Sequence, residues 1–344
     1  MKYRLLGSTG IEVSQLALGT MLLGPWAGVE ESDAAALLHA ALDAGVTVVD
    51  TADVYADGAS EELVGRALRG RRDDVVLSTK GRNPMGPDRN ERGSSRRWIR
   101  RAVEASLVRL NTDRIDLYQL HRPDPGTSIE ETVGALVDLQ REGKIIDYGT
   151  STFSAGALVE AQWAAARLAS PRPTIEQPPY SILARRIEAD VLPTALAHGL
   201  GVLVYSPLAA GWLTGRVRRD APVEDTPRTR SKPNGYFDPA RNERRLAAVE
   251  ALEEVAREAG LTMIQLALAF AVEHPAVSTA LLGVRTPAQL DSQLAAADLR
   301  LDDGVLDAID RIVTPGTTIA DDDDHYAAAV SGDRDGRRRP LTRG

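Results

Sequence analysis

The chain has 344 residues, of which 43% are hydrophobic and 26% are charged, proportions typical of a globular protein that buries a sizeable core. This length fits either two domains or one large α/β barrel, since such barrels commonly reach about 250 residues or more. The chain has no cysteine, which excludes disulfides, thiolate metal sites and a catalytic thiol, and its net charge of −8 argues against nucleic acid or an anionic membrane as a partner.

The first residues, MKYRLLGSTGIEV, lack the charged segment and apolar segment of a secretory signal. No stretch approaches the roughly 18 uninterrupted apolar residues that a membrane span needs. We therefore expect a cytoplasmic protein.

Strand patterns alternate with helical patterns along most of the chain, after a hairpin expected over 3–6 and 11–13. The expected strands and the helices that follow them are 16–19 with 32–44, 46–50 with 60–69, 75–79 with 95–110, 115–121 with 129–141, 145–151 with 155–168, 174–177 with 186–198, 201–205 with 243–259 and 262–273, and 276–282 with 286–297.

These eight strand–helix units favour a single closed (β/α)₈ barrel over an open doubly wound sheet, which usually has five or six strands. The near-continuous apolar strands are typical of a parallel sheet covered by helices. We expect the hairpin to plug the bottom of the barrel and an extra helix to form over 302–313. A capping box, Ser128–Glu131, should open helix 129–141.

The barrel domain is predicted to span 1–315, with a long loop over 208–240 that is rich in Pro, Arg and Gly. The segment 316–344 is predicted to be a flexible charged tail, because it combines the acidic block Asp321–Asp324 with a stretch that lacks apolar periodicity. The run Arg337–Arg339 is read as part of a solvated terminus, with an anion-binding arm as the less favoured alternative.

Four polar residues follow the expected strands at the end where such barrels carry their chemistry. Asp50 ends the second strand, Lys80 follows the third, His121 ends the fourth, and Tyr55 lies in the loop after Asp50. Each residue alone has a structural explanation, as a helix cap, a packing tyrosine or a core histidine. Together they form a specific set at one barrel mouth.

Lys80 is the most informative member, because the chain has 41 − 4 = 37 arginines and only four lysines. Lysine, unlike arginine, is a compact charge whose pKa responds to its surroundings. A buried ammonium needs a partner, for which Asp50 is the obvious choice. Lys80 beside Tyr55 should lower the pKa of the phenol and make it a general acid, and His121 could orient a carbonyl. The set suits carbonyl reduction.

The segments DAGVTVVDTADVY, VVLSTK, SLVRLNTDRIDLYQLHRPDP and VYSPLAAGWLTGR resemble the aldo-keto reductase family, and the resemblance extends from residue 1 to about 313. It is strongest to the branch with bacterial reductases and potassium-channel β-subunits. The resemblance implies NADPH-dependent reduction of an aldehyde or ketone, with Asp50, Tyr55, Lys80 and His121 as catalytic residues and Tyr55 as proton donor.

The resemblance also implies where NADPH or NADP⁺ binds, since the chain has neither a Rossmann G-x-G-x-x-G nor a P-loop. Arg285 is the expected partner of the 2′-phosphate, and Tyr205 should stack on the nicotinamide. The full set of expected cofactor contacts is Gly19, Thr20, Met21, Asp50, Ser151, Gln177, Tyr205, Ser206, Pro207, Leu208, Gly211, Arg216, Gly283, Arg285, Gln289 and Gln293.

Two positions depart from the family pattern. Ser151–Thr152 stands where the family usually has Ser-Asn, which removes one amide contact to the nicotinamide. Ser292–Gln293 replaces the expected Glu-Asn pair, and Ser292 is too short to reach the adenosine as a glutamate would. Gln293 still offers an amide, so the change at Ser292 is the one that predicts weaker adenosine binding.

The expected partner is a small carbonyl substrate. The sequence identifies neither this substrate nor the oligomeric state of the protein. The substrate pocket is expected to include Trp26, Tyr55 and His121, with further walls from Met21–Trp26, Arg82–Met85 and the loop residues Trp212, Tyr236 and Phe237. Trp26 and Tyr236 pack either a substrate or the protein itself.

No H-E-x-x-H or G-x-S-x-G motif supports a zinc peptidase or hydrolase, and no metal site is expected. A minor alternative is an aldolase in which Lys80 forms a Schiff base with the substrate. The main alternative to carbonyl reduction is an NADPH-binding regulatory or redox-sensing subunit with little turnover.

Overall fold

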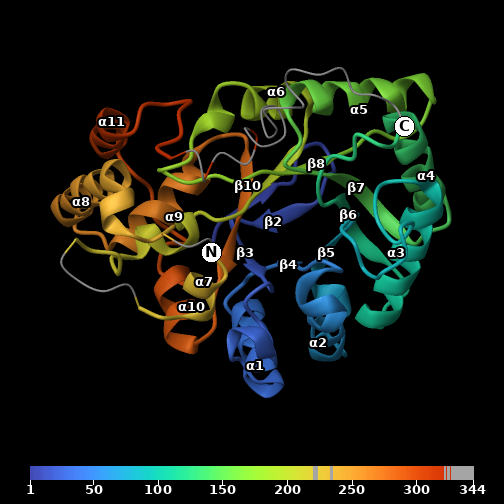
Figure 1. Ribbon diagram of the computed structural model, residues 1–344, viewed down its shortest axis with the longest axis horizontal. Coiled ribbons are helices and arrows are strands. Elements are labelled where there is room, and N and C mark those ends of the chain that lie inside the picture. Colours follow the sequence, from blue (N-terminus) through green and yellow to red (C-terminus); the bar gives the residue numbers. More distant parts are fainter. Residues whose placement is uncertain (220–223, 233–234, 321–322, 324–325, 327–344) are drawn as a thin grey trace.

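A computed structural model describes residues 1–219, 224–232, 235–320, 323 and 326. Its centre is a closed barrel in which eight parallel strands pair in the order β10-β3-β4-β5-β6-β7-β8-β9 (Figure 1). The barrel strands are β3 (Leu16–Gly19), β4 (Val48–Asp50), β5 (Val76–Gly81), β6 (Ile115–Leu120), β7 (Ile145–Ser151), β8 (Ile175–Gln177), β9 (Gly201–Val204) and β10 (Val277–Gly283). The predicted (β/α)₈ barrel is confirmed.

The strands are covered by an outer layer of helices, as their apolar faces require (Figure 1). These helices are α1 (Glu31–Asp43), α2 (Ala59–Ala67), α3 (Arg96–Leu110), α4 (Ile129–Arg141), α5 (Ala155–Arg167), α6 (Val191–His198), α8 (Glu243–Glu258), α9 (Met263–Glu273), α10 (Pro287–Leu294) and α11 (Asp303–Ile312). The last of them is the extra helix predicted over 302–313.

The N-terminal hairpin of β1 (Tyr3–Leu5) and β2 (Glu12–Ser14) supplies the apolar plug of the barrel. Leu6, in its connection, is fully buried and shares a core cluster with inward residues of the barrel strands such as Leu117 and Leu203. The turn passes so close to β9 that a Cβ on Gly7 would lie 2.3 Å from the backbone nitrogen of Gly201. Only glycine fits this position, whose φ is +56°.

Helix 129–141 begins as predicted, but with half of the expected capping box. The Ser128 hydroxyl accepts a hydrogen bond from the backbone N–H of Glu131. The Glu131 carboxylate is turned instead toward Arg96, 3.6 Å away. The Ser128 cap is enough to satisfy one of the open N–H groups at the helix start.

The single helix predicted over 186–198 is wrong, because the structure divides it into a 3₁₀ turn, η4 (Arg186–Glu188), and α6. Asp190 separates them with a φ of −145°, and its carboxylate accepts a hydrogen bond from the backbone N–H of Val191. An aspartate that caps a new helix competes with continuation of the old one.

The long loop over 208–240 contains short ordered elements: η5 (Ala209–Thr214), α7 (Pro227–Arg230) and η6 (Pro239–Arg241). Helix α7 packs against η1 (Pro25–Ala27), the turn that follows β3. The loops that follow β9 and β3, the two strands on either side of β10, therefore meet.

The beginning of the predicted tail packs against the barrel, which differs from the expectation of a flexible segment. Ile319 donates a backbone hydrogen bond to Leu183, and Asp323 pairs at 2.7 Å with the fully buried guanidinium of Arg245. Tyr236 also donates a hydrogen bond to Asp323. Residues 327–344, with the run Arg337–Arg339, lie outside the described residues.

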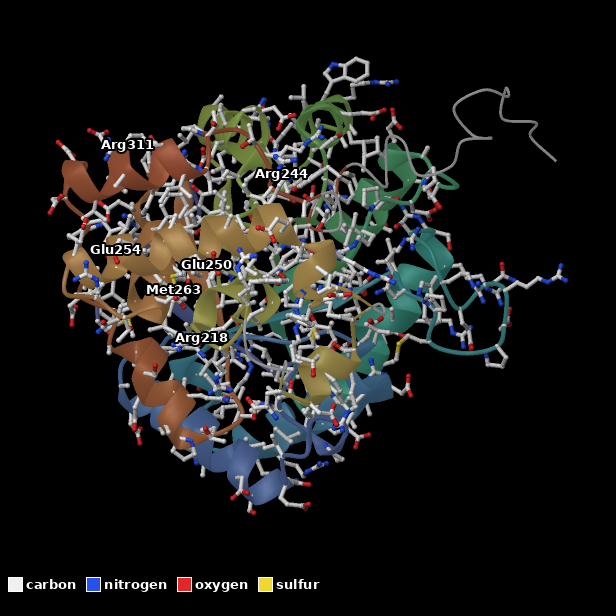
Figure 2. All side chains as sticks on the ribbon, turned by 60° about the vertical axis from the view of Figure 1, so that its left-hand side comes forward. Arg218, Arg244, Glu250, Glu254, Met263 and Arg311 are labelled. Carbon is white, nitrogen blue, oxygen red and sulfur yellow. The ribbon has the colours of Figure 1, made fainter. Side chains whose placement is uncertain are left out.

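Helix α8 has a polar outer face with Arg244, Glu250 and Glu254 exposed on it (Figure 2). Among the described residues, no single helix combines the length and apolar composition needed to cross a membrane. Helices α8 and α9 reach that threshold only as a pair bent by 92°.

Candidate active site

A cavity of about 770 Å³ opens at the carboxyl ends of the strands. The catalytic candidates Asp50, Tyr55 and His121 line it, and Lys80 lies buried behind them. All of the expected cofactor contacts also line it: Gly19, Thr20, Met21, Asp50, Ser151, Gln177, Tyr205, Ser206, Pro207, Leu208, Gly211, Arg216, Gly283, Arg285, Gln289 and Gln293. The fold thus brings residues from distant parts of the chain to one cavity.

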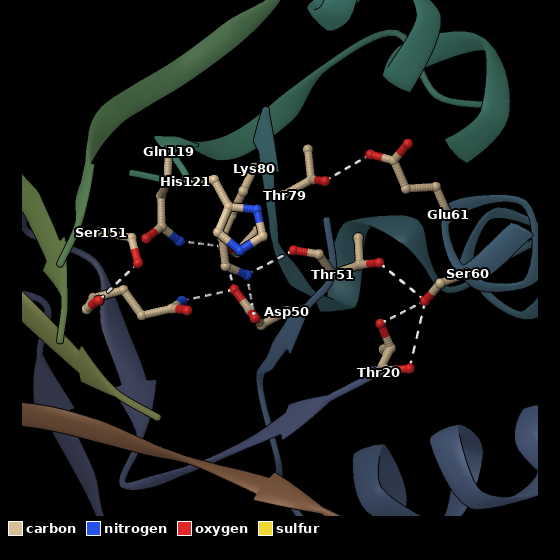
Figure 3. A network of polar contacts seen from close by, with 12 residues as sticks. Thr20, Asp50, Thr51, Ser60, Glu61, Thr79, Lys80, Gln119, His121 and Ser151 are labelled. Atoms are coloured by element: carbon tan, nitrogen blue, oxygen red, sulfur yellow. Dashed lines mark hydrogen bonds and ion pairs between the residues drawn. The ribbon is translucent and has the colours of Figure 1, made fainter. Parts of the chain in front are cut away.

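Lys80 and Asp50 form a buried ion pair between the ends of β5 and β4 (Figure 3). The Lys80 ammonium lies 2.6 Å from the Asp50 carboxylate and donates a second hydrogen bond to the Thr51 carbonyl at 2.7 Å. Ser78 and Gln177 each donate to the other carboxylate oxygen of Asp50 at 2.9 Å. These bonds compensate both charges for their removal from water.

Burial is the largest single influence on Lys80 and opposes its charged form, but the charges of Asp50 and Tyr55 and the hydrogen bond to Asp50 together raise the lysine pKa above its usual value. The ammonium therefore stays protonated near neutral pH. Its nitrogen lies 5.4 Å from the centre of the Tyr55 ring. A permanent positive charge is thus held beside the phenol.

Tyr55 begins the 3₁₀ turn η2 (Tyr55–Gly58) and is half-buried in the cavity wall. The expected lowering of its pKa is wrong in net direction, because burial raises the pKa of the phenol more than Lys80 lowers it. The physical reason is that the phenolate loses more hydration than one ammonium restores. Tyr55 is therefore protonated at neutral pH, as a proton donor must be.

His121 lies edge-on to Tyr55, with 5.9 Å between the ring centres. Burial, followed by the charges of Lys80, Arg122 and Arg82, lowers its pKa to about 2. The imidazole is therefore neutral and carries one proton. The Asn83 amide nitrogen lies 3.2 Å from Nδ1, so Nδ1 accepts and the proton is on Nε2, available to a ligand.

Hydroxyl contacts tie the loop that carries Tyr55 to its neighbours. Ser60, at the start of α2, lies 2.9 Å from the Thr20 hydroxyl and 3.1 Å from the Thr51 hydroxyl (Figure 3). The loop nevertheless contains Ala56 and Asp57 at φ of 50° and 53°. Left-handed backbone at such residues costs about 1–3 kcal/mol each, and this strain at the mouth is typical of a functional site.

A second buried acidic residue, Asp53, lies behind the site and was not singled out from the sequence. Its backbone N–H donates to the Lys80 carbonyl at 3.0 Å, while its carboxyl oxygens have no hydrogen-bond partner among the described residues. Burial, and next the charge of Glu61, raise the pKa of Asp53 to about 7. Asp53 therefore binds a proton that the unfolded chain would release at neutral pH.

This raised pKa predicts how Asp53→Asn changes the pH dependence of stability. The folded protein binds the proton more tightly than the unfolded chain, so the favourable contribution is complete below about pH 4 and is lost as the pH rises toward 7. Wild type should lose about 2 kcal/mol of unfolding free energy between about pH 5 and about pH 8 because of this carboxyl group. Asp53→Asn lacks the group, so its unfolding free energy should rise by that amount relative to wild type over the same interval. Urea unfolding at both pH values measures this.

The exposed Asp57, in the turn η2 that follows Asp53, provides the control. Asp57→Asn should leave the pH profile of the unfolding free energy as in wild type. If the unfolding free energy of Asp53→Asn also follows the wild-type pH profile, the buried carboxyl is ionised in the folded protein. That result would contradict the prediction.

Thr152, where the sequence departs from the pattern that it otherwise resembles, follows Ser151 at the end of β7. Its hydroxyl accepts a hydrogen bond from Arg122 at 3.0 Å and lies 3.3 Å from the Tyr205 hydroxyl. Ser151 donates to the Gln177 backbone carbonyl at 2.8 Å. Thr152 thus connects Arg122 to Tyr205, a role that could not be read from the substitution alone.

At the opposite end, α10 begins beside Gly283 and Arg285. The Arg285 backbone N–H donates to the Gln289 side chain at 2.9 Å, and the Gln293 amide nitrogen donates to the Gly283 carbonyl at 3.0 Å. The Gln293 side-chain oxygen is buried without a partner in the described part of the chain. An unmatched acceptor in the cavity lining fits a ligand that brings a donor, such as an adenine amino group.

Several aromatic residues expected near the substrate lie elsewhere. Trp26 is outside the cavity lining and donates to the Met21 carbonyl at 2.9 Å, and Trp212 is fully buried against Phe237. Tyr236 is buried and donates a hydrogen bond to Asp323, so it belongs to the core. Phe237, another aromatic residue expected near the substrate, does line the cavity. The sequence marks these rings as apolar surface without indicating which of them face the cavity.

Residues 15–314 match the Aldo/keto reductase family. A probable voltage-gated potassium channel subunit beta of Arabidopsis thaliana is 37% identical over 323 residues, which cover 91% of this chain and 97% of that protein. The aldo-keto reductase YhdN of Bacillus subtilis is 38% identical over 297 residues, covering 85% and 87%. An uncharacterized oxidoreductase of the same bacterium, YrpG, is 36% identical over 318 residues, covering 89% and 94%.

The family match extends over most of the chain, and its relatives match it over nearly their whole lengths. The barrel with its hairpin plug and the polar cavity at the strand ends agree with that match. The chain belongs to the aldo/keto reductase family of oxidoreductases.

Proposed function

We propose that the protein reduces an aldehyde or ketone to an alcohol with NADPH. The observation that carries this proposal is the group at one end of the cavity: protonated Tyr55, the Lys80 ammonium beside it and neutral His121 edge-on to it. Such a group delivers one proton to an oxygen and provides no nucleophile. That is the requirement of carbonyl reduction.

In this mechanism His121 donates a hydrogen bond from Nε2 to the carbonyl oxygen and so orients it. NADPH held along the cavity, with Arg285 toward its 2′-phosphate, would supply the hydride that the carbonyl carbon receives. Tyr55 donates its hydroxyl proton to the oxygen, which completes the alcohol and leaves a phenolate. Lys80 stabilises this phenolate, and Asp50 keeps Lys80 charged and in place.

The cofactor part of the proposal is supported by the shape and charge of the cavity. It extends from Asp50 and Tyr55 to Gln293, and its far end carries Arg285 and the start of α10. A helix start and an arginine favour a phosphate. The residues present therefore fit NADPH, with Arg285 toward the 2′-phosphate.

Arg285→Gln should distinguish the two nicotinamide cofactors. Loss of a charge-assisted hydrogen bond should raise the Kd for NADPH about 10- to 100-fold and leave the Kd for NADH unchanged, because NADH has no 2′-phosphate. Fluorescence titration with both cofactors measures this. Arg244→Gln, on the outer face of α8, is the control and should leave both Kd values unchanged. If Arg285→Gln weakens the binding of NADPH and NADH equally, Arg285 does not recognise the 2′-phosphate.

The test of the reaction itself is consumption of NADPH with a panel of aldehydes and ketones. Turnover that yields the alcohol supports the proposal. Tight NADPH binding without turnover of any carbonyl compound contradicts it.

That second outcome would favour a regulatory subunit that binds NADPH. The observation behind this alternative is the 37% identity to a probable potassium channel subunit beta. The complete set of Asp50, Tyr55, Lys80 and His121 around the cavity favours turnover.

A further inference from the structure

A chain of hydrogen bonds runs across three neighbouring strands of the barrel to the Asp50 carboxylate. On β6, the Gln119 amide nitrogen donates to the Ser78 hydroxyl at 2.7 Å, and Ser78, on β5, donates to one oxygen of Asp50, on β4, at 2.9 Å (Figure 3). All three side chains are buried. Neither Gln119 nor Ser78 lines the cavity, so their contact with the site is through Asp50.

The chemistry of the three groups gives this chain one direction. An amide nitrogen only donates hydrogen bonds, and a serine hydroxyl has a single hydrogen. Because Gln119 uses its nitrogen toward Ser78, the hydrogen of Ser78 remains for the carboxylate. Gln119 therefore fixes the Ser78 hydroxyl as a donor to Asp50.

The other end of the Gln119 side chain is unfavourable for stability. Its carbonyl oxygen is buried and has no hydrogen-bond partner within the described part of the chain. An oxygen that leaves water without gaining a partner destabilises the fold, and a methionine of similar length in this position would have no such oxygen. A polar residue that lowers stability in the barrel core, paired in register with Lys80, indicates a functional role.

The chain affects how Asp50 meets Lys80. One carboxylate oxygen lies 2.6 Å from the ammonium, whereas the other accepts hydrogen bonds from Ser78 and Gln177, both at 2.9 Å. Donors on the second oxygen keep it turned away from the ammonium, so a single oxygen of Asp50 accepts from Lys80. The ammonium is then less fully neutralised and retains more positive potential toward Tyr55, whose ring centre lies 5.4 Å from it.

We propose that Gln119 is a positioning residue for proton transfer and that it acts through Ser78. The two residues hold the Asp50 carboxylate in the orientation that leaves the charge of Lys80 available to the tyrosine phenolate. This inference rests on the proposed carbonyl reduction, in which that phenolate forms. Ser78 is the link in the chain, since it contacts both Gln119 and Asp50.

Gln119→Met separates this role from a structural one, because it removes the donor and the unpartnered oxygen together. The single-turnover rate of reduction, measured with the aldehyde of the panel that wild type reduces fastest, should fall about 3- to 10-fold, which corresponds to one hydrogen bond. The midpoint of urea unfolding should equal that of wild type or rise. A wild-type rate of reduction would overturn the proposal.

Gln162→Met is the matched control. Gln162, on α5, is also buried and donates from its amide nitrogen to the Pro173 carbonyl at 2.7 Å. The substitution leaves that carbonyl without this partner, so the unfolding midpoint should fall while the rate of reduction stays as in wild type. The same result for Gln119→Met would show a structural role and overturn the proposal.

The pH dependence reports the effect on Tyr55 itself. In the reverse reaction, oxidation of the alcohol by NADP⁺, the Tyr55 phenolate accepts the proton, so the rate rises with pH. Less positive surroundings make the phenolate harder to form, so Ser78→Ala should move this rise to higher pH by about 0.5 to 1 unit. Ser78→Thr, which keeps a hydroxyl, should restore the wild-type profile. An unshifted profile in Ser78→Ala would overturn the proposal.

These substitutions leave in place the charged and titratable groups that act on the Tyr55 phenol, which are Lys80, Asp50, Arg122, His121, Tyr205 and Arg228. A shift of the profile therefore reports the orientation of these groups and not their loss.

The double variant Ser78→Ala with Gln119→Met tests the order of the chain. If Gln119 acts only through Ser78, the double variant should match Ser78→Ala in its rate of reduction, because the two losses are then not additive. Losses that multiply would show that Gln119 acts on another group and would overturn its assignment.

If wild type turns over no carbonyl compound, the proposed function fails, and the positioning of Asp50 is judged by crystal structures of wild type and Ser78→Ala. The variant should show the Asp50 carboxylate turned so that both oxygens lie within hydrogen-bond distance of the Lys80 ammonium. A carboxylate that keeps one oxygen turned away from Lys80, as in wild type, would overturn the positioning role as well.

Discussion

The Tyr55→Phe variant should lose about 10²- to 10⁴-fold in kcat for carbonyl reduction and bind NADPH as wild type does. The substitution removes one oxygen from the cavity wall and leaves the aromatic ring against His121. The loss is expected because Tyr55 is the group near Lys80 that carries a transferable proton at neutral pH. The neutral His121 can still orient the carbonyl, which explains residual activity.

The kcat and the Kd for NADPH must be measured together. Tyr148→Phe is a matched control, since Tyr148 is a barrel tyrosine that donates to the Pro171 carbonyl at 2.7 Å, away from the cavity. It should lose about 1 kcal/mol of unfolding free energy and keep its kcat. Full activity in Tyr55→Phe would show that another group supplies the proton.

The Lys80→Met variant should lose both activity and stability. Methionine matches the length of the lysine stem but leaves the Asp50 carboxylate buried with only Ser78 and Gln177 as partners. Removal of one member of a buried ion pair costs about 3–5 kcal/mol, because the other charge stays uncompensated. The activity falls as well, since nothing then stabilises the Tyr55 phenolate.

The double variant Asp50→Asn with Lys80→Met separates these two effects. It removes the uncompensated charge, so most of the lost unfolding free energy should return while the activity stays low. Lys144→Met, whose ammonium pairs with Glu104 and Glu142 near the surface, should cost at most about 1 kcal/mol. Urea unfolding and steady-state kinetics measure both quantities; an active double variant would contradict the role of Lys80.

The barrel and its catalytic group could be predicted because their signals are local. Apolar strands followed by amphipathic helices recur eight times, and the polar residues stand directly at the strand ends. Closure of the barrel then brings Asp50 and Lys80 within 2.6 Å. The ion pair follows from composition and position alone, since a lysine after an apolar strand has to find a carboxylate.

What could not be predicted depends on contacts between loops. Asn83 fixes the imidazole tautomer through a 3.2 Å contact that no spacing reveals. The net rise in the Tyr55 pKa also depends on burial, which the sequence does not quantify.

The packing of the segment after α11 was missed for a related reason. Its acidic block suggested a solvated tail, yet Asp323 pairs with a buried arginine that also lies 5.0 Å from the Trp212 ring centre. One ion pair with a buried arginine is thus enough to hold Asp323 against the barrel, although the acidic residues around it in the sequence favour a solvated segment.

The most direct test of the central claim is a single-turnover experiment. The protein is loaded with one equivalent of NADPH and mixed with excess 4-carboxybenzaldehyde, and both NADPH absorbance and the alcohol product are followed. Reduction through Tyr55 predicts that wild type forms one alcohol for each NADPH consumed, and that Tyr55→Phe holds its NADPH unoxidised over the same period. Equal rates of NADPH loss in both proteins would contradict it.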